Sequence, residues 1–106
     1  MVIEQTYNET KNVLSFKIQG ELDVSNISEF KEKLFRGIES HSPNVLMDCA
    51  DLKYIDSTGL GVLVSALKKT KASGGYIKIV RLKPYLQKIF VITALDKIFD
   101  IEVDGK

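Results

Sequence analysis

The sequence contains one cysteine and one histidine among its 106 residues. A single cysteine cannot form an internal disulfide, which is typical of a protein from a reducing compartment. Cys49 and His41 are also too few to build a zinc site from cysteine and histidine ligands. Cys49 lies in an apolar segment and His41 in a polar turn. We therefore expect a buried structural thiol and a solvated imidazole, not a nucleophile and its base.

Long apolar runs are absent as well. No window approaches the ~20 apolar residues of a membrane-spanning helix, and the segment MVIEQTYNETK has no basic region followed by an apolar one, as a signal peptide would. We therefore expect a cytoplasmic protein without a membrane span. Apolar residues make up 44% and charged residues 27% of the chain, which is ordinary for a globular protein. The length predicts a single domain covering residues 1–106.

The glycine-rich loops that bind nucleotides are missing. No segment matches the P-loop pattern, and Gly59-Leu60-Gly61 lacks the third glycine of a dinucleotide fingerprint. Ser57 is not in a nucleophile elbow, because Ile55 stands where the first glycine should be. The net charge of +1 argues against a general nucleic-acid binder. From these absences we expect that the protein binds no cofactor and is not an enzyme.

Charge is unevenly distributed along the chain. Residues 1–56 hold ten acidic and six basic side chains, whereas residues 57–95 hold seven basic ones and no acidic one. The basic residues are Lys68, Lys69, Lys71, Lys78, Arg81, Lys83 and Lys88. They indicate either solvated helix surfaces or a positive face that steers an acidic partner.

Residues 44–75 have the most informative pattern. The nearly continuous apolar run 45–49 predicts a buried strand with both faces of its sheet covered. A short acidic loop follows, and then a helix that begins near Asp56 and ends at Ser73-Gly74-Gly75. The apolar face of this helix has i, i+3, i+4, i+7 spacing and consists of Leu60, Leu63, Val64 and Leu67.

The remaining elements alternate around this segment. We expect a hairpin of strands 2–7 and 13–19 ended by Gly20, and a helix opened by an Asn26–Glu29 capping box and stopped before Pro43. A strand at 76–80, a helix beginning at Pro84 and a strand at 98–103 complete the order ββαβαβαβ. This is an α/β fold with a mixed four- to five-stranded sheet packed with helices.

The candidate site is the helix start at Asp56-Ser57-Thr58-Gly59. An exposed Ser57 hydroxyl there is a plausible phosphorylation site, because a helix N-terminus tolerates an anion. An ordinary N-cap explains the same residues equally well. A magnesium site of a receiver domain is a further alternative, although Asn8-Glu9 in a turn replaces the expected acidic pair. Its candidate ligands are Asp23, Asp48, Asp51 and Asp56.

Two sequence blocks together resemble the STAS domain of anti-sigma factor antagonists. They are Gly20-Glu21-Leu22-Asp23 and Asp56-Ser57-Thr58-Gly59-Leu60-Gly61. The resemblance covers nearly the whole chain and implies the STAS fold and a regulator without catalytic activity. Members bind an anti-sigma factor, often a serine kinase of the histidine-kinase-like ATPase fold, and so free a sigma factor. Phosphorylation of the antagonist by that kinase releases it, and a PP2C-type phosphatase reverses the modification.

The resemblance also implies roles for individual residues. Ser57 matches the phosphoacceptor, and Asp23 and Asp56 match carboxylates beside it. The residues Thr58, Gly59, Leu60 and Gly61 match the helix start that contacts the kinase. Some relatives are not phosphorylated, so a STAS scaffold subunit of a lipid-transport or stress-signalling complex is the alternative function.

Overall fold

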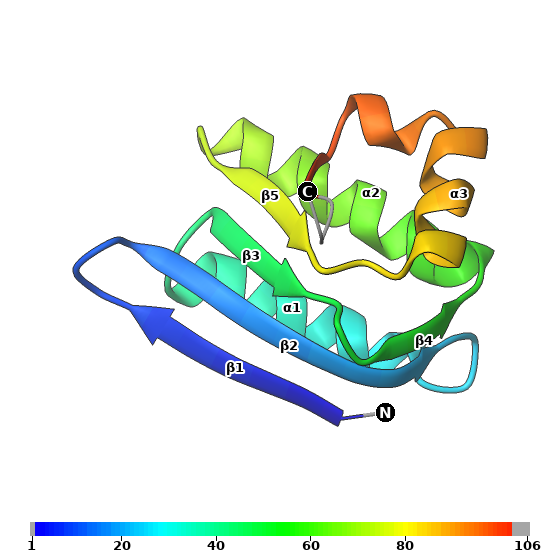
Figure 1. Cartoon of the computed structure of the whole chain (residues 1–106). Helices are drawn as coiled ribbons and strands as arrows, with labels where there is room; N and C mark the ends of the chain where they lie inside the picture. The colour runs from blue at the N-terminus through cyan, green and yellow to red at the C-terminus, as the bar shows by residue number, and fades with distance from the viewer. Residues whose placement is uncertain (1, 103–106) are drawn as a thin grey trace.

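The computed structural model describes residues 2–102 and contains a mixed sheet flanked by helices (Figure 1). The antiparallel pair β1 and β2 is followed by parallel strands, in the spatial order β1-β2-β3-β5-β6. The short strand β4 lies off this path and pairs with the end of β2. The strands are β1 (Val2–Asn8), β2 (Val13–Leu22), β3 (Asn44–Asp48), β4 (Leu52–Ile55), β5 (Tyr76–Val80) and β6 (Asp100–Glu102). The predicted α/β class and mixed sheet are confirmed.

The helices occupy the connections between parallel strands. They are α1 (Ile27–Ser40), α2 (Ser57–Ala72), α3 (Pro84–Ile92) and the 3₁₀ turn η1 (Leu95–Lys97). Pro84 takes the first position of α3, as predicted, where its missing N–H costs no hydrogen bond. Within the described part of the chain, no helix has the length and apolarity to cross a membrane.

The expected element order was wrong at one point, because it placed a loop where β4 forms. Only Leu52 and Ile55 of β4 are buried, so this strand shows no alternation of period two. Gly20 also does not end β2. It adopts φ = +98°, which favours glycine, and the register shifts between Gly20 and Glu21. This bulge redirects β2 so that its last residues pair with β4, giving six strands and not four to five.

The core lies on one face of the sheet. Alternate residues of the central strands are buried there: Leu14, Phe16, Ile18, Val45, Met47, Ile77 and Ile79. Both α1 and α2 cover this face (Figure 1), and Lys69 of α2 pairs with Glu39 of α1 at 2.9 Å.

The prediction that both faces of the 45–49 strand are covered was wrong, since Leu46 and Asp48 are only half-buried. The strand order explains the difference. The path β2-β3-β5-β6 advances in one direction, and right-handed crossovers then place every connecting helix on the same face.

Several element ends differ from the sequence expectations. The side chain of Asn26 does not cap α1, so the Asn26–Glu29 capping box was wrong. The strand expected at 98–103 begins later than expected, because β6 starts only at Asp100. Its expected last residue, Val103, lies outside the described residues. The glycine stop after α2 is confirmed: Gly74 has φ = +79°, and the Gly75 N–H donates to Thr70 O at 2.7 Å.

Candidate functional site

The site is built where β4 ends and α2 begins. Asp56 is the N-cap of α2, and one oxygen, Oδ1, accepts hydrogen bonds from the Gly59 N–H at 3.1 Å and the Thr58 hydroxyl at 2.5 Å. The bond from the Gly59 N–H satisfies one of the backbone donors that the first turn of a helix otherwise leaves free. Ser57 is therefore the first residue of the helix and not its cap.

The other oxygen of Asp56 holds a second loop against the helix start. Asp56 Oδ2 accepts from the Val24 N–H at 3.2 Å, and the Asp56 N–H donates to Leu22 O at 3.1 Å. Val24 follows Asp23, whose Oδ1 accepts from the Ser25 N–H at 3.0 Å and the Ser25 hydroxyl at 2.6 Å. The structure thus brings together the two loops that carry Asp23 and Asp56, which are far apart in sequence.

The two adjacent hydroxyl groups are not equivalent. Ser57 and Thr58 are both exposed, but the Thr58 hydroxyl donates to Asp56. Among residues 2–102, the Ser57 hydroxyl has no hydrogen-bond partner. Ser57 is therefore the accessible hydroxyl of the pair, on the first turn of a helix and next to a carboxylate.

The hydrogen bonds that Asp56 accepts stabilise its ionised, negatively charged form. The bond from the Thr58 hydroxyl, followed by that from the Gly59 N–H, lowers the pKa of the Asp56 carboxyl below its ordinary value. Asp56 is consequently ionised at neutral pH, and any negative group added at Ser57 would lie beside an existing negative charge.

The two glycines of the helix start serve different purposes. Gly59 is buried, and a Cβ placed there would lie 2.7 Å from Ile55 Cγ1 and 3.2 Å from Leu22 Cγ. Gly61 is exposed, and a Cβ there would meet nothing within 4 Å. Gly59 is therefore required by the packing of α2, whereas Gly61 leaves a low, open surface one turn from Ser57. Leu60 between them is half-buried.

Sequence reasoning missed the apolar side chains around this site. Val24 is 74% exposed in the loop that Asp56 holds, and Tyr54 of β4 and Tyr85 of α3 are also exposed. The Tyr85 hydroxyl donates to Lys53 O at 2.5 Å, which brings α3 against β4. In the sequence, Val24 was visible only as an apolar residue next to Asp23. Its exposure could not be predicted, because it depends on contacts between residues that are distant in sequence.

The structure does not support the other chemistries considered. Within residues 2–102, no group of three or more His, Cys, Asp and Glu side chains could hold a metal ion. Asp48 instead pairs with Arg81, and Asp51 accepts from Gln19 Nε2 at 3.5 Å. The four aspartates therefore do not form the magnesium site of a receiver domain.

The lone cysteine and histidine lie at opposite ends of β3. Cys49 is buried as predicted, and burial, followed by the charge of Asp48, raises the pKa of its thiol to about 12. His41 is exposed, and its ring stacks on Tyr7 with 4.9 Å between centroids. The two side chains consequently do not form a thiol–imidazole pair.

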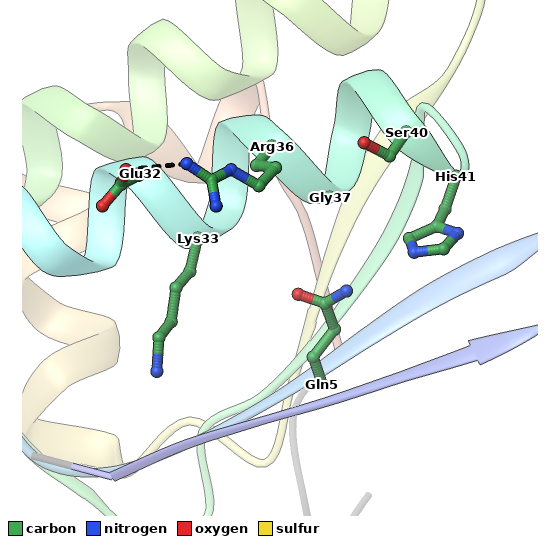
Figure 2. A pocket seen from close by; sticks show the side chains of 7 residues that line it. All are labelled: Gln5, Glu32, Lys33, Arg36, Gly37, Ser40 and His41. Atoms are coloured by element: carbon green, nitrogen blue, oxygen red, sulfur yellow. Dashed lines mark hydrogen bonds and ion pairs between the residues drawn. The ribbon is translucent and has the colours of Figure 1, made fainter.

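A hollow of about 280 Å³, lined mostly by residues with polar or charged side chains, lies between α1 and β1, away from the site (Figure 2). Its cationic side chains already have partners: Arg36 pairs with Glu32 at 2.8 Å, and Lys33 pairs with Glu29 at 3.4 Å. Figure 2 shows Gln5 of β1 pointing into this hollow from below the helix. The hollow lies along the second half of α1, whereas the Asp23 loop lies before the first turn of that helix. The hollow is therefore not part of the site.

Comparisons with known proteins agree with this fold. A family model described as the STAS domain matches residues 4–104. An anti-sigma-B factor antagonist of Bacillus subtilis (strain 168) is 35% identical over 106 residues, which cover 100% of this chain and 96% of that protein.

Among solved structures, the NMR structure of the protein TM1081 has a TM-score of 0.83 at 25% identity and covers 97% of this chain and 82% of that one. The Bacillus cell fate determinant SpoIIAA, in its phosphorylated form, has a TM-score of 0.76 at 17% identity and covers 99% and 93%, a likeness of fold alone.

Proposed function

The chain belongs to the STAS domain family, and we propose that it is an anti-sigma factor antagonist whose binding is switched off by phosphorylation of Ser57. The unphosphorylated chain binds an anti-sigma factor in the cytoplasm and thereby frees a sigma factor. The anti-sigma factor is an ATP-binding serine kinase of the histidine-kinase-like fold, and a PP2C-type phosphatase restores the active form. The role is one of binding, without catalysis by this chain.

The observation that carries the proposal is the exposed Ser57 hydroxyl beside Asp56, a hydroxyl that has no hydrogen-bond partner in the part of the chain that the structure describes. A kinase needs an accessible hydroxyl, and the neighbouring Thr58 hydroxyl is bound to the Asp56 carboxylate. The surrounding surface also suits a protein partner, because Val24 and the low surface at Gly61 flank the serine. Exposed apolar side chains next to polar ones are typical of an interface.

Electrostatics explains why the modification would break the complex and leave the fold intact. A phosphate adds about −1.5 to −2 charges, and the α2 N-terminus partly compensates them within the chain. At an interface, the phosphate would act together with ionised Asp56 and the adjacent Asp23 loop. Like charges placed opposite each other across an interface cost several kcal/mol. The switch therefore acts on the complex and not on the stability of the domain.

The test is a pull-down from native lysate with three baits, followed by mass-spectrometric identification. The baits are the wild type, Ser57→Asp and the control Ser40→Asp, which places the same charge on another exposed serine, at the end of α1. We expect the wild type and Ser40→Asp to retain an ATP-binding kinase-like protein that Ser57→Asp loses. Retention of one membrane-associated ATPase or permease by all three baits would contradict the switch and favour the scaffold subunit.

A further inference from the structure

A second surface lies on the other half of α2. It is a groove of about 460 Å³ between α2 and the junction of η1 with β6. We call it the basic groove, and it is lined by Val64, Leu67, Lys68, Lys71, Lys97 and Ile98. None of these residues belongs to the two sequence blocks around Ser57.

The basic groove has an apolar floor. Leu67 is buried, Val64 is half-buried, and Ile98 is 48% exposed at the far wall. Val64, Leu67, Lys68 and Lys71 follow the i, i+3, i+4, i+7 spacing, so they lie on one face of α2. The groove is open to solvent and is not an enclosed cavity. It can therefore receive side chains from a helix, but it cannot enclose a lipid chain and remove it from water.

The rim of the basic groove carries unneutralised positive charge. Lys68, Lys71 and Lys97 are exposed, and within residues 2–102 none of them forms an ion pair. The other lysine of this region, Lys69, is already paired with Glu39 of α1. The nearby Asp96 lines a different hollow with Gln87, Val91 and Ile101. Among the residues that the structure describes, no acidic side chain lines the basic groove.

We propose that the basic groove binds an acidic amphipathic helix of a protein partner. Apolar side chains of that helix would contact Val64, Leu67 and Ile98, and its carboxylates would pair with the three rim lysines. An amphipathic helix in an apolar groove is a recurrent mode of recognition, and the charge of the rim selects an acidic one. A second copy of this chain fits less well, because the exposed face of α1 mixes charges in the pairs Glu29–Lys33 and Glu32–Arg36.

The basic groove is continuous with the Ser57 surface. Residues 57, 61, 64, 68 and 71 are spaced by three or four positions, so they form one stripe along α2. From residue 57 to residue 71 this stripe is about 21 Å long, at about 1.5 Å per residue. A partner that covers Ser57 at one end can therefore place a helix in the groove at the other. Binding in the groove itself does not require Ser57.

The test uses the ¹⁵N-labelled chain and a synthetic helical peptide with leucines at i, i+3, i+4 and i+7 and glutamates on both flanks. We expect amide shift changes at Val64, Lys68, Lys71 and Ile98. A peptide with lysines in place of the glutamates should not bind. The variant Lys68→Glu/Lys71→Glu should weaken binding by roughly tenfold or more, because attraction becomes repulsion. The control Lys11→Glu/Lys88→Glu reverses two exposed lysines outside the groove and should bind as the wild type does.

Other results would overturn the assignment. Equal binding of the glutamate and lysine peptides would show that the rim charges select nothing. Shifts caused by oleate or by self-association, without shifts from the acidic peptide, would assign the groove to a lipid or to a second copy of the chain. Failure of the peptide to bind, with Ser57→Asp still losing the captured kinase, would reject the groove and leave the proposed switch in place.

Discussion

At the scale of single residues, Asp56 gives two neighbouring hydroxyl groups different roles. Its carboxylate binds the Thr58 hydroxyl and does not bind that of Ser57. That a carboxylate lies next to Ser57 could be recognised from sequence, because Asp56 and Ser57 are adjacent. The bond from the Val24 N–H to Asp56 could not, because 32 positions separate the residues and only the fold brings them together.

Alanine substitutions should separate the two hydroxyls. With the captured kinase and ATP, we expect Thr58→Ala to be phosphorylated like the wild type and Ser57→Ala to remain unmodified, as measured by intact mass. Thr58→Ala should also lower the urea midpoint, because the Asp56 carboxylate loses one donor. Ser57→Ala should leave that midpoint unchanged. Full phosphorylation of Ser57→Ala would place the modification at another residue.

The two glycines of the helix start predict stability effects of opposite sign. In Gly59→Ala, the new methyl group would clash with Ile55 and Leu22, so we expect a loss of roughly 1–2 kcal/mol, as overpacked cores show. Gly61→Ala has open space and should gain up to ~1 kcal/mol from helix propensity. Urea unfolding at neutral pH measures both changes. A stabilised Gly59→Ala would mean that Ile55 moves aside without cost.

At the scale of elements, the helices and strands that could be predicted from sequence are those with a regular spacing of apolar residues along one buried face. The 76–80 strand has its predicted bounds, and α2 buries Leu63 and Leu67 of its predicted apolar face. Prediction from sequence failed where an element forms only because it pairs with a strand that is distant in sequence. β4 is a strand because the bulge at Gly20 turns the end of β2 toward it, and four residues with buried ends carry no period of their own.

One ion pair connects two such elements and predicts a pH effect. Asp48 ends β3 and binds Arg81, which follows β5. Partial burial alone would raise the pKa of Asp48, but the hydrogen bond from Arg81, the Ala50 N–H and the charges of Arg81 and Lys17 lower it overall. A carboxyl with a lowered pKa in the folded state stabilises the fold above its unfolded pKa of about 3.9. That contribution is lost as the pH falls through the folded pKa.

Asp48→Asn should therefore be less stable than the wild type at pH 7, by about 1 kcal/mol for a partly exposed pair. The difference should shrink as the pH falls below about 4, because protonation then neutralises Asp48 in the wild type as well. Urea unfolding of both proteins from pH 3 to pH 7 measures this. A difference that stays constant with pH would show that Asp48 acts through its shape and not through its charge.

At the scale of the whole molecule, the topology divides the surface into distinct faces. Every helix that connects parallel strands lies on one face of the sheet, so the opposite face is left to paired charges such as Lys78–Glu102 at 3.0 Å. The seven basic residues of 57–95 are consequently not one positive face. Lys69, Lys78 and Arg81 have acidic partners, and Lys68 and Lys71 belong to the basic groove. Sequence order alone could not show this, because it does not say which charges are neutralised.

The buried thiol offers a test of the single domain predicted for residues 1–106. Cys49 is 3% exposed, its N–H donates to Val80 O at 2.9 Å, and its raised pKa leaves almost no thiolate at neutral pH. A thiol reagent should therefore label the folded chain at least about a thousandfold more slowly than the unfolded chain. If the chain unfolds as one unit, the free energy of opening obtained from labelling should equal that from urea unfolding. A clearly smaller labelling value would mean that the end of β3 opens on its own, and the chain would then not be a single cooperative domain.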